Sequence, residues 1–402
     1  MSKTSDTATG IAPITSTERF GELDILRGFA LLAVFVVHFV GASFYDLPLE
    51  ESLSESWNAD VLQRGAVFLS DWWFENKGNT LFATLFGMGF WVMMERLEAR
   101  GSDFQRIYLR RLTALFLIGL VHLFLLFPMD VLHEYALLGF ALFFMRKLSA
   151  PAMLVLGLVL AFVGQPLGDF LAGELVTGER AESRWQEVFA GGSYAEWVAW
   201  WPGWHLYLEI ERGGLLGWAL YILGRFLLGA WIIRMGFVAR ARELLPLMRR
   251  ICLVALPLGL VLELVSLLQW MELLPKTDWS DTALHEIGGP ILALGYATGL
   301  ILLYHSNWRG WVAQLAPVGR TALSAYVGHG VAWTFLFFPM GLGMQGRLTP
   351  AASMLVALGL FAAFTLAAKF WLARYRYGPL EYLWRWATYG SRPKFRLQPA
   401  AA

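Results

Sequence analysis

The feature that most constrains this chain is a series of about ten apolar stretches, each close to the length of a helix that crosses a lipid bilayer. Such a crossing needs about 20 apolar residues. With 57% hydrophobic and only 16% charged residues, the chain carries more apolar surface than a soluble core of this size would bury. The sequence therefore predicts an all-α polytopic integral membrane protein with about ten transmembrane helices. The expected spans are 25–45, 78–94, 112–128, 131–147, 152–169, 214–234, 250–270, 286–305, 318–340 and 350–373.

The distribution of positive charge predicts which ends of the spans face the cytoplasm, because Lys and Arg concentrate in cytoplasmic loops. If the N-terminus is cytoplasmic, most of the 32 Lys and Arg residues fall in inner loops and in the two terminal segments. Both termini are therefore expected in the cytoplasm, with the chain spanning a plasma membrane several times. The outer loops then hold only Arg64, Lys77, Arg180, Arg184, Arg212, Lys276 and Arg347.

The segments outside the spans predict one integrated membrane domain. We expect a cytoplasmic N-terminal segment over 1–24, a single membrane domain over 25–373 and a cytoplasmic tail over 374–402. The outer loop 170–212 contains GGSYAEWVAWWPGWHLYLE, whose aromatic residues predict a lid on the membrane surface. The stretch 61–75 is amphipathic and is expected to lie along the outer interface.

Several functions are disfavoured by what the sequence lacks. A net charge of +1 gives no basic surplus for nucleic acid, and one cysteine, Cys252, excludes disulfide and Cys-based metal frameworks. Walker, dinucleotide-binding, GxSxG and HExxH motifs are absent. We therefore expect no metal cofactor and no nucleic-acid partner. Membrane lipids are the expected surroundings, and association into a homo-oligomer stays open.

Five ionisable side chains fall well inside the predicted spans, where such groups are costly and usually functional. They are His38, His122, Arg225, Glu263 and His329. Arg225 and Glu263 lie in spans that follow each other in sequence, and they form either a buried ion pair or a catalytic or substrate-binding pair. Glu263 alone would be a proton-relay candidate. His329 is either a lining residue of the same cavity as His38 or a hydrogen-bonded structural residue.

The first span carries an arginine and a histidine whose spacing places them on one helix face. His38 is eleven positions after Arg27, so they lie within ~20° of each other around the helix and ~16 Å apart along it. Asp24 is one turn before Arg27 and can pair with it, and Gly28 allows close approach of a helix or ligand. Arg27 is predicted to meet anionic phosphate, with His38 deeper in the membrane.

The same spacing recurs on the third span, between Arg111 and His122. This recurrence is either an internal repeat or a chance match between two apolar helices. Arg110 and Arg111 either determine topology or bind a diphosphate, which guanidinium groups hold bidentately. Beyond the third span, Asp130 and Tyr135 stand in FPMDVLHEYALLG, at the expected outer mouth. Asp130 is expected to cap the next helix or to face a substrate.

Five stretches together resemble one family along nearly the whole chain. They are RFGELDILRGFALLAVFVVHFV, TLFATLFGMGFWVMMER, RRLTALFLIGLVHLFLLFPMDVLHEYALLG, GRTALSAYVGH and YGPLEYLWRWATYG. The first resembles the opening helix of the YeiB-like family (domain of unknown function, DUF418), and the others resemble its later signatures in the expected order. YeiB-like members more often carry Asn where His38 stands and Gln where His329 stands. That family is similar to the wider transmembrane acyltransferase group, whose O-acyltransferases have an Arg, ten intervening residues and a His on the first helix, as Arg27 and His38 do.

The resemblance implies a ten-helix fold that transfers an acyl group from cytoplasmic acyl-CoA to an acceptor across a bacterial inner membrane. Acetyl-CoA or another acyl-CoA would be the co-substrate, with its phosphates held by Arg27, Arg110 and Arg111. His38 or His122 would act as a general base or as a transient acyl carrier.

The acceptor implied by this resemblance is a glycan or another envelope component, including a lipid-linked one. It would arrive at the mouth formed by Asp130, Tyr135 and the aromatic lid. Two other functions stay open from the sequence. One is a transporter or flippase of a small or lipid-linked solute, and the other is a non-catalytic membrane scaffold.

Overall fold

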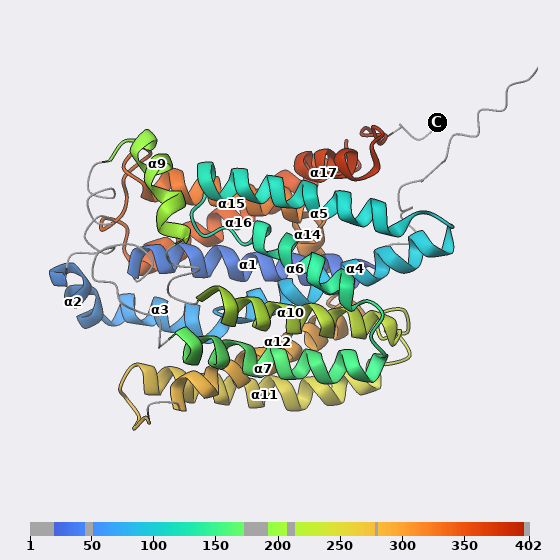
Figure 1. Cartoon of the computed structure of the whole chain (residues 1–402). Coiled ribbons are helices and arrows are strands. Elements are labelled where there is room, and N and C mark those ends of the chain that lie inside the picture. Colours follow the sequence, from blue (N-terminus) through green and yellow to red (C-terminus); the bar gives the residue numbers. More distant parts are fainter. Residues whose placement is uncertain (1–19, 45–50, 173–191, 207–213, 278–279, 398–402) are drawn as a thin grey trace, which may run out of the picture.

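The computed structural model describes residues 20–44, 51–172, 192–206, 214–277 and 280–397. Within these residues the chain is helical, and the only β-type pairing is an isolated bridge between Tyr375 and Arg396. Most helices run side by side in one elongated bundle (Figure 1). Seven of the described helices are long and apolar enough to cross a membrane. The predicted polytopic helical membrane protein is confirmed at this level.

All ten predicted spans coincide with helices. Seven fall on the long apolar helices, which are α1 (Gly21–Phe44), α5 (Phe104–Val121) with its π-helical extension η2 (His122–Leu126), α7 (Ala150–Ala172), α10 (Gly214–Arg234), α11 (Leu245–Trp270), α12 (Ser280–Tyr304) and α16 (Pro350–Leu372). The other three fall on α4 (Lys77–Ala99) and on two shorter apolar helices, α6 (Leu132–Met145) and α15 (Ala322–Phe337).

Shorter elements cover both ends of the bundle. They are α2 (Glu51–Ala59), α3 (Val61–Trp73), α9 (Tyr194–Leu206), α13 (Arg309–Val312), η4 (Ala313–Leu315), α14 (Ala316–Arg320) and α17 (Pro379–Tyr389). Their limits follow from local chemistry. Asp60 caps α3 by accepting hydrogen bonds from two backbone amides, and α17 begins with Pro379 and ends at Gly390 in the left-handed conformation.

Helix α1 is the central element of the bundle. It packs against α14, α15 and α16 on one side and against α4 and α12 on another. In Figure 1, α5, α15 and α16 lie on one side of α1, and α10, α7, α12 and α11 lie on the other. Several α1 side chains, including Phe35 and Phe39, are fully buried, so this apolar helix faces protein and not lipid.

Helices α4 and α10 are in close contact because each presents a glycine to the other. A Cβ atom on Gly87 would overlap the carbonyl oxygen of Phe226, and one on Gly229 would overlap the carbonyl oxygen of Thr84. Small residues permit such close packing of helices within a membrane. Helix α10 packs mainly against α4 and α7.

The segments outside the predicted spans are described only in part. Residues 1–19 of the N-terminal segment and 173–191 and 207–213 of the predicted lid lie outside the described residues. The described part of the lid contains α9, whose Trp197 and Trp201 are buried, with Trp197 packed edge-on against Phe338. The predicted tail contains α17, which packs against α5 and α15.

Candidate functional site

A cavity of about 430 Å³ lies between α1, α4, α5, α6, α15 and α17. Its volume falls within the range of about 300–1,000 Å³ typical of small-molecule sites. Both Arg27 and His38 line it, so it extends at least ~16 Å along α1. Its basic mouth is defined by six arginines, namely Arg27, Arg96, Arg100, Arg111, Arg320 and Arg385.

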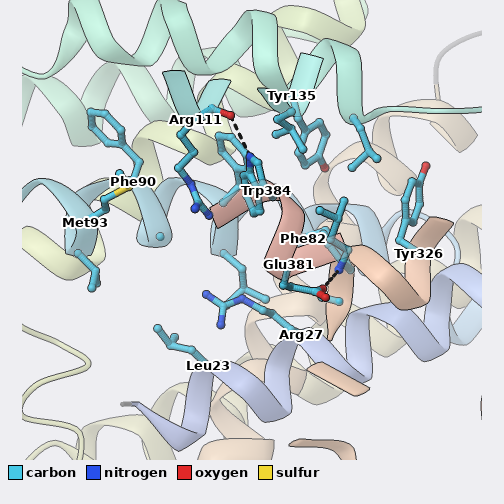
Figure 2. A pocket seen from close by; sticks show the side chains of 18 of the residues that line it. Leu23, Arg27, Phe82, Phe90, Met93, Arg111, Tyr135, Tyr326, Glu381 and Trp384 are labelled. Atoms are coloured by element: carbon cyan, nitrogen blue, oxygen red, sulfur yellow. Dashed lines mark hydrogen bonds between the residues drawn. The ribbon is translucent and has the colours of Figure 1, made fainter. Parts of the chain in front are cut away.

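Arginines of the basic mouth come from helices on opposite sides of the cavity. Arg27 of α1 and Arg111 of α5 extend towards the same space (Figure 2). The predicted pairing of Arg27 with Asp24 is confirmed, with 3.2 Å between Nη1 and Oδ1. Arg111 lies over the ring of Trp384, 3.4 Å from its centroid, and Trp384 Nε1 donates to the Arg111 carbonyl oxygen at 2.9 Å. The mouth therefore concentrates positive charge beside aromatic rings, a combination that suits a phosphorylated ligand.

Helix α17 closes one wall of the mouth and is fastened through Glu381. Its carboxylate accepts hydrogen bonds from the backbone amides of Leu323 and Ser324 at 2.7 and 3.0 Å, at the start of α15 (Figure 2). Ser324 Oγ also donates to Glu381 at 2.5 Å. Burial raises the pKa of Glu381 above its ordinary value, although these hydrogen bonds favour the charged form. The stretches YGPLEYLWRWATYG and GRTALSAYVGH are thus in direct contact.

At the deep end of the cavity three histidines surround one phenylalanine. The rings of His38, His122 and His329 lie 5.3, 5.5 and 5.3 Å from the ring of Phe127. His38 Nδ1 and His329 Nε2 share a hydrogen bond of 3.2 Å. Of the three, His38 lines the cavity, whereas His122 and His329 are buried behind it. We call His38, His122 and His329 the histidine cluster.

His122 is held by Asp130. Its Nδ1 lies 2.7 Å from Asp130 Oδ1, and Asp130 Oδ2 accepts the backbone amides of Leu132 and His133 at 2.9 and 3.2 Å. The predicted capping role of Asp130 is therefore confirmed, and the same carboxylate also orients an imidazole. Since a carboxylate only accepts, His122 Nδ1 carries the proton. In a neutral ring this leaves Nε2 as the basic atom, and Nε2 is buried without a hydrogen-bond partner among the described residues.

A local change of helix type positions His122. Helix α5 ends in a single π-helical turn that starts at His122, and the Phe127 amide donates to the His122 carbonyl at 2.7 Å. Such turns are frequent at functional sites. Gly330 of α15 makes room for the ring, because a Cβ there would meet His122 Nε2 and Phe127. The two Arg–His pairs predicted on separate helices thus converge on one cavity and one cluster.

The predicted ion pair between Arg225 and Glu263 is wrong. Arg225 Nε donates to Thr80 Oγ1 at 3.0 Å, and Nη1 donates to the carbonyl oxygens of Ala161 and Tyr221. The guanidinium also lies over the Tyr221 ring, 3.0 Å from its centroid. Glu263 instead forms an ion pair with Lys77 and lies 3.1 Å from His285. The reason is tertiary: α10 packs against α4 and α7, whereas α11 pairs with α12. Neither Arg225 nor Glu263 lines the cavity.

Three further predicted residues have distinct positions. Tyr135 lines the cavity, and its hydroxyl donates to Asn79 Oδ1 at 3.0 Å. Arg110 lies outside the lining and donates to the carbonyl oxygen of Ala387 at 2.9 Å. Gly28 is also outside it, where it accommodates the backbone of Leu315.

Sequence reasoning missed much of the cavity wall. In the sequence, Arg320 and Arg385 stood out only as positive charges of the expected cytoplasmic segments. No local pattern marked Tyr326 or Trp384 as residues that line a cavity. The resemblance did mark the segments in which these four residues stand, and those segments meet at the cavity. Among the described residues, no group of three or more His, Cys, Asp or Glu side chains has the arrangement of a metal site.

Comparison with known proteins agrees with the motifs. The family described as "Protein of unknown function (DUF418)" matches residues 232–391. YxaH of Bacillus subtilis is 29% identical over 398 residues, which cover 94% of this chain and 96% of that protein. YeiB of Escherichia coli is 29% identical over 405 residues, covering 92% and 96%. The chain is thus similar to YeiB-like proteins along most of its length, and its residues 232–391 match the DUF418 family. Both relatives carry the word "uncharacterized" in their names, so the similarity assigns no reaction.

The region matched by the DUF418 family supplies only part of the site. It contains Arg320, His329, Glu381 and Trp384, on or next to α14, α15 and α17. The arginine and histidine of α1 come from outside it. Both YeiB-like relatives nevertheless align with more than nine-tenths of the chain, so they cover both walls of the cavity.

Proposed function

We propose that this YeiB-like protein is a membrane acyltransferase that uses cytoplasmic acyl-CoA, such as acetyl-CoA, as its donor. The observation that carries the proposal is the cavity itself, because it joins six arginines at one end to His38 at the other. Acyl-CoA carries several phosphates at one end and the thioester at the other, so its binding and reaction require positive charge at one end of the cavity and an imidazole deep inside it. The similarity of the family to transmembrane acyltransferases supports the same reading.

The donor binds with its phosphates in the basic mouth. Arg27 and Arg111 project into that space from opposite sides, and guanidinium groups bind phosphate bidentately. The pantetheine arm then extends along α1, past apolar lining residues such as Val34 and Leu85, towards His38. The ~16 Å rise between Arg27 and His38 separates the site of the phosphates from the site of the thioester.

The chemistry falls to His38 because it is the cluster member that lines the cavity. With its Nδ1 bonded to His329, His38 presents Nε2 to the reacting groups. Nε2 takes the proton of an acceptor hydroxyl or amine while Nδ1 passes a proton to His329. The acceptor atom bonds to the acyl carbon, the carbon–sulfur bond breaks, and the proton taken from the acceptor returns from the His38–His329 pair to the CoA sulfur. His122, fixed by Asp130, is a second imidazole beside this pair.

The orientation follows from charge. The basic mouth faces the cytoplasm, so both termini are cytoplasmic and about ten helices cross the inner membrane of a bacterium. The acceptor, a glycan or a lipid-linked envelope component, approaches from the opposite side. Asp130, Tyr135 and the tryptophans of α9 are the residues proposed to meet it, and of these Tyr135 lines the cavity. Trp and Tyr rings suit such an acceptor because they stack on sugar rings.

The test is transfer of radiolabel. Purified protein in nanodiscs is incubated with acetyl-CoA labelled in the acetyl group and with an envelope glycan extract. Label in the glycan fraction and release of free CoA are expected, and His38→Ala abolishes both. The matched control is His305→Ala, since His305 bonds Glu22 outside the cavity and its loss leaves transfer intact. The proposal is refuted if the folded wild-type protein neither binds acetyl-CoA nor transfers the label. Movement of a solute into vesicles without CoA release would favour a transporter instead.

A further inference from the structure

A second polar cluster lies outside the cavity, where α4 begins. It consists of Glu75 in the turn before α4, Lys77 at the start of α4, Glu263 on α11 and His285 near the start of α12. None of these four residues lines the cavity. We call them the carboxylate–histidine cluster. The acyl-transfer proposal assigns it no role.

Both ring nitrogens of His285 face carboxylates. Nε2 lies 2.6 Å from Glu75 Oε2, and Nδ1 lies 3.1 Å from Glu263 Oε2. Glu263 Oε2 also accepts a hydrogen bond from Lys77 Nζ, and Lys77 donates in addition to the Asp71 carbonyl at 2.9 Å. Glu263 Oε1 is buried and has no hydrogen-bond partner in the described part of the chain.

Counting protons across these contacts gives a definite result. A carboxylate oxygen only accepts, and a neutral imidazole has one N–H donor, so a neutral His285 cannot donate to two carboxylates. The cluster therefore holds one proton more than neutral His285 and ionised Glu75 and Glu263 would carry. That proton is not on Glu263, because Oε2 already accepts from Lys77 and Oε1 has no acceptor to donate to. It lies on the line between His285 Nε2 and Glu75 Oε2.

We propose that His285, Glu75 and Glu263 form a proton-binding site at the end of the bundle opposite the basic mouth. Its ligand is a single proton shared by His285 and Glu75. With the proton bound, Lys77 and His285 balance the two glutamates, and without it the cluster carries one net negative charge. A buried net charge is unfavourable, so proton binding and the packing of this region are coupled.

The exposed members give the proton its access. The side chains of His285 and Glu75 are 29% and 36% exposed, whereas Lys77 and Glu263 are almost completely buried. His285 stands at the start of its apolar span, close to the expected membrane surface. The proton therefore exchanges with the aqueous phase through His285 and Glu75.

The surrounding groups leave this proton count unchanged. Glu286, next to His285 on α12, interacts electrostatically with Arg225 of α10. Tyr296 of α12 lies close enough to Glu263 to interact with it. Arg225 is therefore the cation that faces Glu286, and Lys77 is the cation bonded directly to Glu263.

The site fastens three elements that meet beside the cavity. It joins the turn before α4 to α11 and α12, and two residues after Lys77, on the same helix, Asn79 lines the cavity. The position of this wall thus depends on whether the proton is bound.

The experiment detects the proton without any substrate. Protein labelled with ¹⁵N-histidine is reconstituted in nanodiscs at pH 8, and ¹⁵N chemical shifts separate neutral from doubly protonated rings. We expect a doubly protonated signal that disappears in His285→Gln and becomes neutral in Glu75→Gln. Alternatively, the proton sits on Glu75 and gives a carboxylic-acid infrared band that is lost in Glu75→Gln, which also supports the site. His305→Gln is the matched control, because His305 Nε2 contacts one carboxylate, Glu22, and its loss leaves both signals intact.

A neutral His285 together with no carboxylic-acid band in the Glu75→Gln difference spectrum overturns the proposal. Glu75→Gln keeps the test decisive if His285→Gln does not fold, since Glu75 is the more exposed partner. The outcome is independent of acyl transfer, because the readout is the protonation state of His285 and Glu75 without any substrate.

Discussion

Replacing Lys77 by Met tests the ion pair that the structure shows and the sequence did not predict. The side chains of Lys77 and Glu263 are 0% and 2% exposed, so each single substitution leaves a charge in a dry environment. Removing one partner of a buried ion pair costs about 3–5 kcal/mol. The destabilisation by Lys77→Met is expected at the lower end of this range, because His285 still contacts Glu263. The destabilisation by Glu263→Gln is expected at the upper end.

The double variant Lys77→Met, Glu263→Gln removes both charges at once. Its destabilisation is expected to be smaller than the sum of the single effects by at least about 1 kcal/mol. The assay is reversible unfolding in mixed detergent micelles, followed by the fluorescence of the 19 tryptophans. The control cycle combines Arg225→Met with Glu263→Gln and is expected to be additive within about 0.5 kcal/mol, because these residues make no contact. Additivity in the first cycle and coupling in the second would refute the reasoning.

Three further outcomes are expected. Asp130→Asn lets the ring of His122, which lies beside the His38–His329 pair, adopt the other tautomer, so acyl transfer falls by less than in His38→Ala, as a label-transfer assay would measure, while the loss of the α6 cap costs about 1 kcal/mol. Burial raises the pKa of Glu381 in the folded protein, so the stability contributed by this carboxyl is present below about pH 4.5 and is lost as the pH rises through the raised value. Glu381→Gln removes that pH dependence, which the difference between the two melting curves from pH 4 to 8 reveals. Reporter fusions at the two termini should both give a fluorescent, cytoplasmic signal and no alkaline phosphatase activity.

Contacts within one helix or turn could be predicted from the sequence because helix periodicity fixes them. Asp24 and Arg27 are three residues apart and pair as expected, and Asp130 caps the helix that starts two residues later. The spacing of Arg27 and His38 likewise placed both on one face, and both line one cavity.

Contacts between helices could not be predicted in the same way. The pairing of Arg225 with Glu263 assumed that spans adjacent in sequence are adjacent in space, but the glycine contact between α4 and α10 decides otherwise. Lys77 was counted as a loop charge, because its burial depends on α11 and α12, nearly 200 residues away. The bond between His38 and His329 spans 291 residues, and no local pattern encodes it.

The most direct test of the account is a cryo-electron microscopy structure with a non-hydrolysable thioether analogue of acetyl-CoA. The account predicts phosphate density against Arg27 and Arg111, with the arm running along α1 and the acyl end beside His38. An analogue bound elsewhere, or held only at the mouth with its acyl end remote from His38, would contradict it.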